Sequence, residues 1–420
     1  MNPIVIVFGV GIRRWIAALT AVFVVGGGAA GCSARDSTDA TIDVDAAVAL
    51  ADQPIQLRVS GLRARETVTV ASQAADLRGQ RWSGEATFEA DGDGVVDLTR
   101  SAPVSGTYSG ADGMGLFWSM WPATGDPERA WFSPGYPDAM GAYEVRLTVT
   151  AAGREIAART VTRQWIAPGV THRALTPGAD GVAGVLFLPA AGAERRPGVL
   201  LIGGSEGGIG SRYDAALLAS HGHPTLTLGY FGAPGLPETL RDIPLEYFAT
   251  AARLLSGQAG ADPDGVVVNG YSRGTEAALL LAQYYPDLVR STILYAPNDR
   301  VWPSFPDRVG NAWTLGGAPV PQSAIPVTHV RGPVLTIAGG DDKLGPAAEQ
   351  AQRIMQRLDD ANVTAAHQTL IYPDAGHAVG TFPHLARGTF AGALALGGTR
   401  RADAAARSDS WPKVLAFVAA

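Results

Sequence analysis

The pattern of apolar and polar positions divides the chain into two parts at about residue 168. In the first part, short segments alternate apolar with polar residues and are separated by turn pairs such as Asp91-Gly92. Such alternation is typical of strands that bury one face of a sheet. It predicts an all-β domain, an antiparallel sandwich of the immunoglobulin-like type, over residues 47–168. The expected strands cover residues 55–61, 67–74, 81–90, 94–100, 143–153 and 155–166.

In the second part, almost entirely apolar runs of strand length alternate with amphipathic stretches of helical length. This order is typical of a mostly parallel sheet that helices cover on both faces. It predicts an α/β domain over residues 175–420. The expected strands cover residues 197–204, 224–232, 265–272, 291–297, 332–340 and 367–373, and the expected helices cover 211–222, 245–258, 273–286, 347–361 and 410–419.

A segment rich in glycine and aromatic residues, 106–122, separates the fourth expected strand from the fifth. We expect a long loop here, and the pattern requires no helix in the β domain. We also expect Trp118 and Trp121 to pack against a neighbouring surface. A ligand-lining role for the two tryptophans is the alternative interpretation.

The N-terminus indicates export. Residues 1–31 contain a pair of arginines, then an apolar run and then small residues, which is the order of a signal peptide. With the preceding Ala-Ala-Gly, Cys32 resembles the lipobox of bacterial lipoproteins, so we expect lipidation and anchoring to a membrane of the cell envelope. The alternatives are an ordinary cleaved signal, which gives a periplasmic or extracellular protein, and an uncleaved anchor. Residues 32–46 are polar and predict a tether.

Composition narrows the class of function. The 420 residues carry a formal net charge of −6, and the basic residues are scattered, so no basic stripe for nucleic acid is present. Cys32 is the single cysteine, which excludes an internal disulfide. The sequence contains no H-E-x-x-H or paired-cysteine motif, so we expect neither a metal nor an organic cofactor.

The segment Gly270-Tyr271-Ser272-Arg273-Gly274 carries the strongest chemical signal. It follows an expected strand and opens an expected helix. In that context G-x-S-x-G forms a sharp turn that exposes the serine hydroxyl, and it predicts Ser272 as the nucleophile of an α/β-hydrolase. The alternative is a purely structural turn.

A serine hydroxyl needs a base, and the base needs an acid that orients it. Asp341 and Asp342 follow one of the expected strands, and we favour Asp342 as the acid, with Asp341 as the alternative. His377 belongs to a Gly-His pair after the last expected strand, and we favour it as the base over His384. We expect the other histidines to be packing or surface residues.

The oxyanion of an acyl-transfer intermediate needs backbone N–H donors that are already in place. We expect one from Arg273, at the start of the helix. The other should come from Ser205 or Glu206 in the glycine-rich loop 203–208. This loop lacks the Lys-Ser/Thr ending of a P-loop and a G-x-G-x-x-G pattern, so a phosphate-binding role is not indicated.

Several segments, taken in order, resemble the family of acyl-CoA thioesterases related to bile acid-CoA:amino acid N-acyltransferase. In the first part they are IQLRVSGL, RWSGEATFEADGDGVVDL and SGTYSGADGMGLFWSM, and in the second GLPETLRDIPLEYFATAARLL, GYSRG, GGDDK, AGH and DSWPKVLAF. The resemblance covers nearly all of the chain after the tether. It implies the family's β domain before an α/β-hydrolase domain, with the nucleophile on Ser272, the acid on Asp342 and the base on His377.

The resemblance also implies an activity, hydrolysis of an acyl-CoA-like thioester or of a carboxylic ester. Members with a serine nucleophile resemble hydrolases, whereas the amide-forming members use cysteine. Transfer of the acyl group to an amine or an envelope acceptor is one alternative, and a non-catalytic envelope binding protein is another. The export signal departs from the family, whose known members act on CoA esters inside cells. Neither acyl length nor oligomeric state follows from the sequence.

Overall fold

The structure, a computed structural model, describes residues 40–420, so the expected signal peptide and Cys32 lie outside the described residues. Strand β1 (Thr41–Val44) falls within the segment that we expected to be a tether. It pairs antiparallel with β3 (Leu57–Ser60) over its four residues, and it buries Ile42. The tether prediction is therefore wrong from Thr41 onward, because this polar stretch gains its order from a partner strand.

Two β-sheets make up the region before residue 168, which we name the β region. The smaller sheet has the order β1-β3-β6, and the larger has the order β2-β10-β9-β4-β5-β7, with β8 also paired to β5. Neighbouring strands run antiparallel except β2 and β10, which run parallel and so depart from the expectation. The remaining bounds are β2 (Val48–Leu50), β4 (Thr67–Ala75), β5 (Arg81–Glu89), β6 (Val96–Asp97), β7 (Ser105–Gly106), β8 (Trp121–Pro122), β9 (Ala142–Ala151) and β10 (Arg154–Gln164).

The segment expected to be a long loop contains a helical turn, α1 (Gly115–Trp118), and a 3-10 turn follows at η1 (Pro127–Arg129). Trp118 is 6 % exposed and donates a hydrogen bond from Nε1 to Asp112 Oδ2 at 2.7 Å. Trp121, by contrast, is 47 % exposed. The packing prediction was right for Trp118 and wrong for Trp121, and the segment contains a helical turn that the pattern did not require.

The second part of the chain builds an eight-stranded sheet with the order β11-β12-β14-β13-β16-β17-β20-β21. From β14 to β21 the neighbours run parallel, and the first two pairs run antiparallel. The sheet starts at Thr171, four residues before the expected domain start, with a strand whose side chains are mostly exposed and so lack an apolar pattern. Its strands are β11 (Thr171–Leu175), β12 (Ala183–Leu188), β13 (Arg196–Ile202), β14 (Thr225–Gly229), β16 (Ala261–Tyr271), β17 (Val289–Tyr295), β20 (Val334–Gly339) and β21 (His367–Tyr372).

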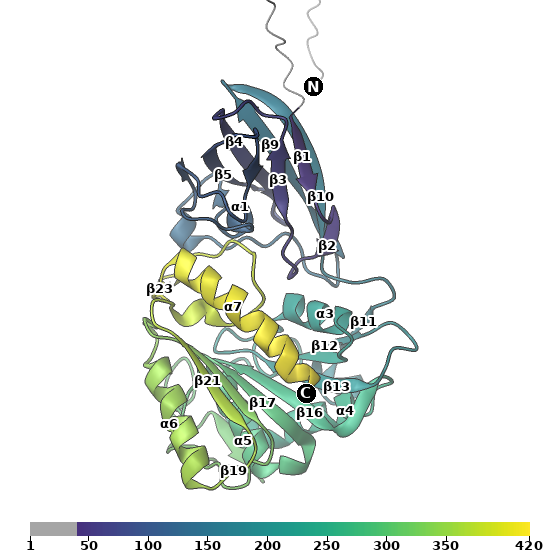
Figure 1. Ribbon diagram of the computed structural model, residues 1–420. Helices are drawn as coiled ribbons and strands as arrows, with labels where there is room; N and C mark the ends of the chain where they lie inside the picture. The colour runs from purple at the N-terminus through teal and green to yellow at the C-terminus, as the bar shows by residue number, and fades with distance from the viewer. Residues whose placement is uncertain (1–39) are drawn as a thin grey trace, which may run out of the picture. The chain divides into compact units, whose positions relative to one another are not determined.

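Helices cover both faces of this sheet, as expected for an α/β-hydrolase fold (Figure 1). Val199 and Leu201 of β13 pack with α3 and α7, whereas Leu200 and Ile202, on the opposite face, pack with α4 and α5. The helices are α2 (Pro177–Asp180), α3 (Arg212–Ser220), α4 (Leu245–Ser256), α5 (Gly274–Tyr284), α6 (Ala347–Asp360) and α7 (Arg400–Ala419), with 3-10 turns η2 (Pro286–Leu288) and η3 (His377–Val379). Short strands complete the fold at β15 (Ile243–Pro244), β18 (Trp313–Leu315), β19 (Ala318–Pro319), β22 (Phe390–Ala391) and β23 (Leu394–Ala395).

One hydrophobic cluster joins the β region to the face of the sheet that carries α3 and α7. The Trp165 ring lies 4.5 Å from the Tyr213 ring and 5.5 Å from the Phe382 ring, centroid to centroid. Asp52 Oδ2 accepts a hydrogen bond from Trp411 Nε1 at 2.8 Å. The two parts therefore share a core. Among residues 40–420, no helix has the length and apolar character that crossing a membrane requires.

Candidate active site

Ser272 occupies a sharp turn between β16 and α5. Its φ is +51°, and its N–H donates to Tyr295 O at 2.9 Å. A Cβ on Gly270 would lie 2.6 Å from Gly274 O, and a Cβ on Gly274 would lie 2.3 Å from Gly203 O. Both glycines are thus required by close backbone contacts, which hold the serine in the strained geometry of a nucleophile elbow.

His377 and Asp342 form a buried pair at the ends of two neighbouring strands. His377 Nδ1 lies 2.7 Å from Asp342 Oδ2, and Asp342 Oδ1 accepts a second hydrogen bond, 2.8 Å long, from Leu344 N–H. Because a carboxylate only accepts, Nδ1 carries the proton and Nε2 is left as the acceptor. Tyr271 Oη donates to His377 O at 3.0 Å, which holds the η3 turn against β16.

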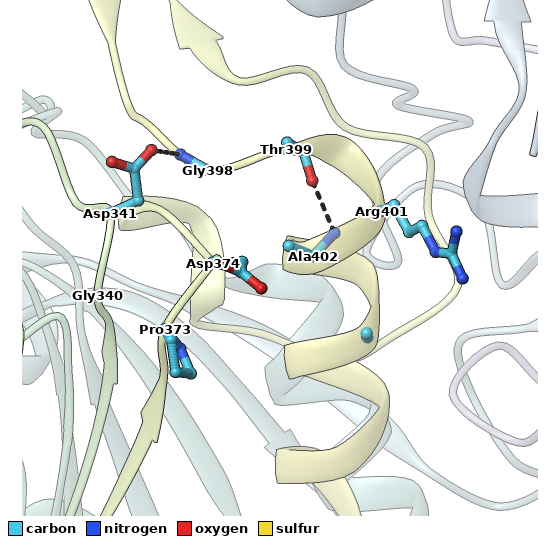
Figure 2. A pocket seen from close by; sticks show the side chains of 9 residues that line it. Gly340, Asp341, Pro373, Asp374, Gly398, Thr399, Arg401 and Ala402 are labelled. Carbon is cyan, nitrogen blue, oxygen red and sulfur yellow. Dashed lines mark hydrogen bonds between the residues drawn. The ribbon is translucent and has the colours of Figure 1, made fainter.

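The alternative acid, Asp341, faces a different set of groups. Its side chain is 43 % exposed, compared with 2 % for Asp342. Asp341 pairs with Lys343 and accepts a hydrogen bond from Gly398 N–H at 2.9 Å, and these contacts lower its pKa. Figure 2 shows Asp341 on the rim of a separate hollow of about 620 Å³ at the start of α7.

The alternative base, His384, is buried at the junction with the β region and has a φ of +78°. Burial lowers the pKa of His384 to about 3, and the positive charges of Arg163 and Arg407 add to this effect, while Asp52 opposes it. An imidazole in this setting stays neutral and is poorly placed to take up a proton. The structure thus brings His377, and not His384, into contact with Asp342.

Ser272 and His377 both line a cavity of about 760 Å³. The predicted oxyanion residues Ser205 and Glu206 line it as well, so the structure brings these four predicted residues to one site. Most of its remaining lining is apolar or aromatic. These side chains are Trp131, Phe132, Tyr136, Leu201, Ile202, Ile209, Tyr213, Tyr271, Tyr295, Phe305, Leu344, Leu385, Phe390, Ala391, Leu394 and Leu396.

The glycine-rich loop lies directly against Ser272, since a Cβ on Gly204 would be 3.0 Å from Ser272 Cβ. Tyr230 Oη holds the loop by donating to Gly203 O at 2.9 Å and Gly204 O at 2.7 Å. Gly204 N–H is already bound to Glu206 Oε1 at 3.0 Å. Burial of the carboxyl raises the pKa of Glu206, although the residue as a whole is exposed to the cavity.

Arg273 follows Ser272 as the N-cap residue of α5. Its side chain forms a salt bridge of 2.5 Å with Glu276, which is fully buried and also accepts from Trp313 Nε1 at 2.8 Å. Burial raises the pKa of Glu276, and the positive charge of Arg273 opposes this shift. The side chain of Arg273 therefore anchors the first turn of the helix. The oxyanion prediction concerns the backbone N–H of Arg273 and not this side chain.

Sequence patterns did not reveal the cavity wall that the β region supplies. Trp131 and Tyr136 line the cavity, together with Phe390 and Arg387 from the other part of the chain. These side chains come from segments about 250 residues apart, and neither segment carries a motif. Within residues 40–420, no group of three or more His, Cys, Asp or Glu side chains is placed to hold a metal ion.

Two parts of the chain match known protein families. Residues 52–177 match the acyl-CoA thioester hydrolase/BAAT N-terminal region, and residues 309–420 match the BAAT/acyl-CoA thioester hydrolase C terminal. Acyl-coenzyme A thioesterase 6 of Mus musculus is 30 % identical over 401 residues, which cover 87 % of this chain and 93 % of that protein. The chain belongs to the acyl-CoA thioester hydrolase/BAAT family.

Other members of the acyl-CoA thioester hydrolase/BAAT family are similar over the same length. Acyl-coenzyme A amino acid N-acyltransferase 1 of Mus musculus is 28 % identical over 88 % of this chain and 94 % of its own. Among solved structures, dipeptidyl peptidase 4 of Porphyromonas gingivalis covers 82 % of this chain and 48 % of its own, at 15 % identity and a TM-score of 0.42. The family and the sheet topology identify the chain as an enzyme, a thioesterase-like hydrolase.

Proposed function

We propose that the protein is a serine hydrolase that cleaves an acyl thioester or a carboxylic ester through a seryl acyl-enzyme. Ser272 is the nucleophile, His377 the general base and Asp342 the acid that orients it. The observation that carries this proposal is the convergence on one cavity of the strained Ser272 turn and the His377–Asp342 pair. No metal or organic cofactor enters the mechanism.

In the first half of the reaction, Ser272 Oγ attacks the acyl carbonyl carbon while His377 Nε2 takes the hydroxyl proton. Asp342 stabilises the imidazolium that forms, and backbone N–H groups stabilise the oxyanion, one from Arg273 and one from Ser205 or Glu206. The tetrahedral intermediate expels the thiolate or alkoxide, which receives the proton from His377. In the second half, water attacks the acyl-enzyme by the same route and releases the acid.

The acyl donor that we propose is an acyl-CoA-like thioester, with carboxylic esters as the second class. The names of similar family members, among them acyl-coenzyme A thioesterase 6 of Homo sapiens, favour a thioester. The apolar and aromatic walls of the cavity suit an acyl group, because burial of apolar surface stabilises the bound acyl chain.

Substitution of Ser272 tests the mechanism. Ser272→Ala should lower kcat by about 10³-fold or more, because no other atom is proposed to form the acyl-enzyme. Intact mass spectrometry of a rapidly quenched reaction should find the acyl adduct on residue 272 of the unsubstituted protein. Ser256→Ala, at the end of α4 and outside the cavity, is the control for folding. Full activity in Ser272→Ala, or an adduct on another residue, contradicts the proposal.

A second candidate function is transfer of the acyl group to an amine, which the similarity to N-acyltransferases favours. The test measures how an acyl donor divides between hydrolysis and amide formation when glycine or taurine is added. We expect hydrolysis for the unsubstituted protein, whereas Ser272→Cys, whose acyl-enzyme is a thioester, should gain relative transfer to the amine. Amide as the main product of the unsubstituted protein would establish a transferase, and turnover of neither kind would favour a binding protein.

We further propose that the protein is exported and anchored to a membrane of the cell envelope by lipid on Cys32. The order of arginine pair, apolar run and small residues over 1–31 supports this proposal. Cys32→Ala should release the protein from the membrane fraction or leave its precursor unprocessed, while hydrolysis by the folded part persists. Unchanged fractionation and processing would exclude lipidation.

We also propose that the β region is an immunoglobulin-like sandwich. Its two mainly antiparallel sheets and the alternating burial along β4 and β5 support this architecture. The test is an experimental structure of the protein, in which the three-stranded sheet should pack face to face on the larger one.

A further inference from the structure

The cavity has a cationic side as well as an apolar one. Three arginines line it, and each stacks on an aromatic ring that also lines it. The pairs, with the distance from guanidinium carbon to ring centroid, are Arg129 over Phe390 at 4.2 Å, Arg212 over Tyr136 at 4.9 Å and Arg387 over Trp131 at 5.3 Å. Stacking holds a guanidinium flat and leaves its edge for hydrogen bonds.

Two of these arginines are engaged by protein groups. Arg212 Nη1 donates to Asp138 Oδ2 at 2.9 Å, and Arg129 Nη1 donates to Gly392 O at 3.2 Å. Arg387 Nη2 reaches Thr381 Oγ1 only at 3.5 Å, the outer limit of a hydrogen bond. Since a guanidinium carries five N–H donors, Arg387 keeps the most hydrogen-bonding capacity for a molecule in the cavity.

Asp214 supplies the negative charge that acts on Arg387, but its carboxylate accepts hydrogen bonds from other groups. Asp214 Oδ1 accepts from Thr381 Oγ1 at 2.7 Å and from Phe382 N–H at 3.2 Å. Burial lowers the pKa of Arg387, and the negative charge of Asp214 opposes that shift. Thr381 therefore stands between the two charges, and Asp214 balances Arg387 without filling its hydrogen-bonding edge.

The backbone around Arg387 is fixed by the β region. Phe132 N–H donates to Ala386 O at 2.9 Å, and Gly388 N–H donates to Ala130 O at 2.9 Å, so Trp131 and Arg387 face each other across a short antiparallel bridge. A guanidinium on such a fixed backbone loses little conformational freedom on binding.

We propose that Arg387 binds a carboxylate at the far end of the acyl group, so that the enzyme prefers acyl donors that end in a carboxylate over alkyl donors of equal length. The proposal rests on the proposed hydrolase function. Guanidinium and carboxylate match in a bidentate, charge-assisted pair. Arg387 is half-buried in the wall of the cavity that Ser272 also lines, and most of that wall is apolar or aromatic, as an acyl chain requires, so we assign Arg387 to the acyl part of the donor.

The test compares glutaryl and pentanoyl thioesters of one uncharged aryl thiol, which differ only in the terminal carboxylate. We expect the unsubstituted protein to have a kcat/KM at least about tenfold higher for the glutaryl donor. In Arg387→Met this ratio should fall by about 10-fold to 100-fold, because the larger loss of kcat/KM falls on the glutaryl donor. Free glutarate should inhibit the unsubstituted protein competitively and Arg387→Met far more weakly.

Arg357→Met is the matched control, because Arg357 is also half-buried and paired but lies on α6, away from the cavity. It should leave the donor ratio unchanged. If Arg387→Met fails to fold, Arg387→Lys keeps the cation without the planar fork and should give an intermediate ratio.

Three results would overturn the proposal. They are no glutaryl preference in the unsubstituted protein, equal loss for both donors in Arg387→Met, and, when the CoA esters of the same two acids are also assayed, a loss confined to these CoA esters, which would assign Arg387 to the leaving group. A protein that hydrolyses neither donor contradicts the hydrolase function itself. Hydrolysis of the pentanoyl donor without any glutaryl preference contradicts the role of Arg387 alone.

Discussion

Asp341 and Asp342 are adjacent in the chain, yet they serve opposite environments. Asp342 is buried against His377, whereas Asp341 points to Lys343 and to the backbone at the start of α7. Asp341 lies in the turn that follows β20, whereas Asp342 pairs with Gly397 across an isolated bridge, so the backbone directs the two carboxylates to different neighbours. The conformation of this loop therefore decides which of the two carboxylates contacts His377 in η3.

This arrangement predicts a sharp difference between two conservative substitutions. Asp342→Asn should lower kcat by about 10²-fold to 10⁴-fold, because an amide neither fixes the productive tautomer of His377 nor stabilises its imidazolium. Asp341→Asn is the matched control and should keep kcat within about threefold, since its carboxylate serves a surface ion pair. Steady-state rates with one ester substrate distinguish the two variants, and the reverse order would reassign the acid.

At the scale of elements, the turn between β16 and α5 depends on close backbone packing. Gly274 lies against the ends of β13, where a Cβ would be 2.3 Å from Gly203 O and 2.4 Å from Ile202 O. The same contact places the glycine-rich loop 203–208 beside Ser272, so a change at Gly274 should affect both stability and the proposed active site.

Gly274→Ala should therefore lower the free energy of unfolding by about 1 to 3 kcal/mol and reduce activity, because the backbone must shift to admit the methyl group. Gly178→Ala, in α2, is the control, because a Cβ there meets nothing within 4 Å and its φ is not positive. This control should change the free energy of unfolding by less than about 0.5 kcal/mol. Urea unfolding of both variants checks the prediction, and equal stability of the two would contradict it.

At the scale of the whole molecule, buried histidines link stability to pH. Burial lowers the pKa of His384 to about 3 and that of His223 to about 4. The unfolded chain binds protons on these imidazoles below pH of about 6.5, whereas the folded protein does not until the pH reaches the lowered values. Both groups therefore destabilise the folded protein as the pH falls from about 6.5 to about 4.

Near pH 5 each of these histidines should contribute a slope of about 1.4 kcal/mol per pH unit to the free energy of unfolding. His384→Asn should remove one such slope, and asparagine tolerates the positive φ at this position. His172→Asn, on the exposed strand β11, is the control and should keep the slope of the unsubstituted protein. Urea unfolding at pH 7, 6 and 5 measures the slopes, and identical slopes in all three proteins would refute this prediction.

The sequence by itself determined the features that depend on short stretches of chain. Apolar runs marked β13, β14, β17 and β20 to within a few residues, because a strand buried on both faces is almost entirely apolar, and a shorter apolar run marked the partly exposed edge strand β21. The spacing of Gly270, Ser272 and Gly274 marked the turn, since the backbone clash that requires glycine is local to it. Alternation of apolar and polar residues marked β4, β5, β9 and β10, because successive side chains of a strand point to opposite faces of the sheet.

The tertiary structure decided which distant segments meet. Polar or exposed strands such as β1 and β11 owe their order to partner strands, and α7 begins ten residues before its apolar stretch because Thr399 caps it there. The cavity wall forms where residues 130–132 pair with residues 386–388, which is invisible in either segment alone. The periodicity of a segment shows only which of its residues face the core and which face solvent. It does not show which other segment packs on its apolar face. The residues that lie near Ser272 therefore follow only from the packing of the whole chain.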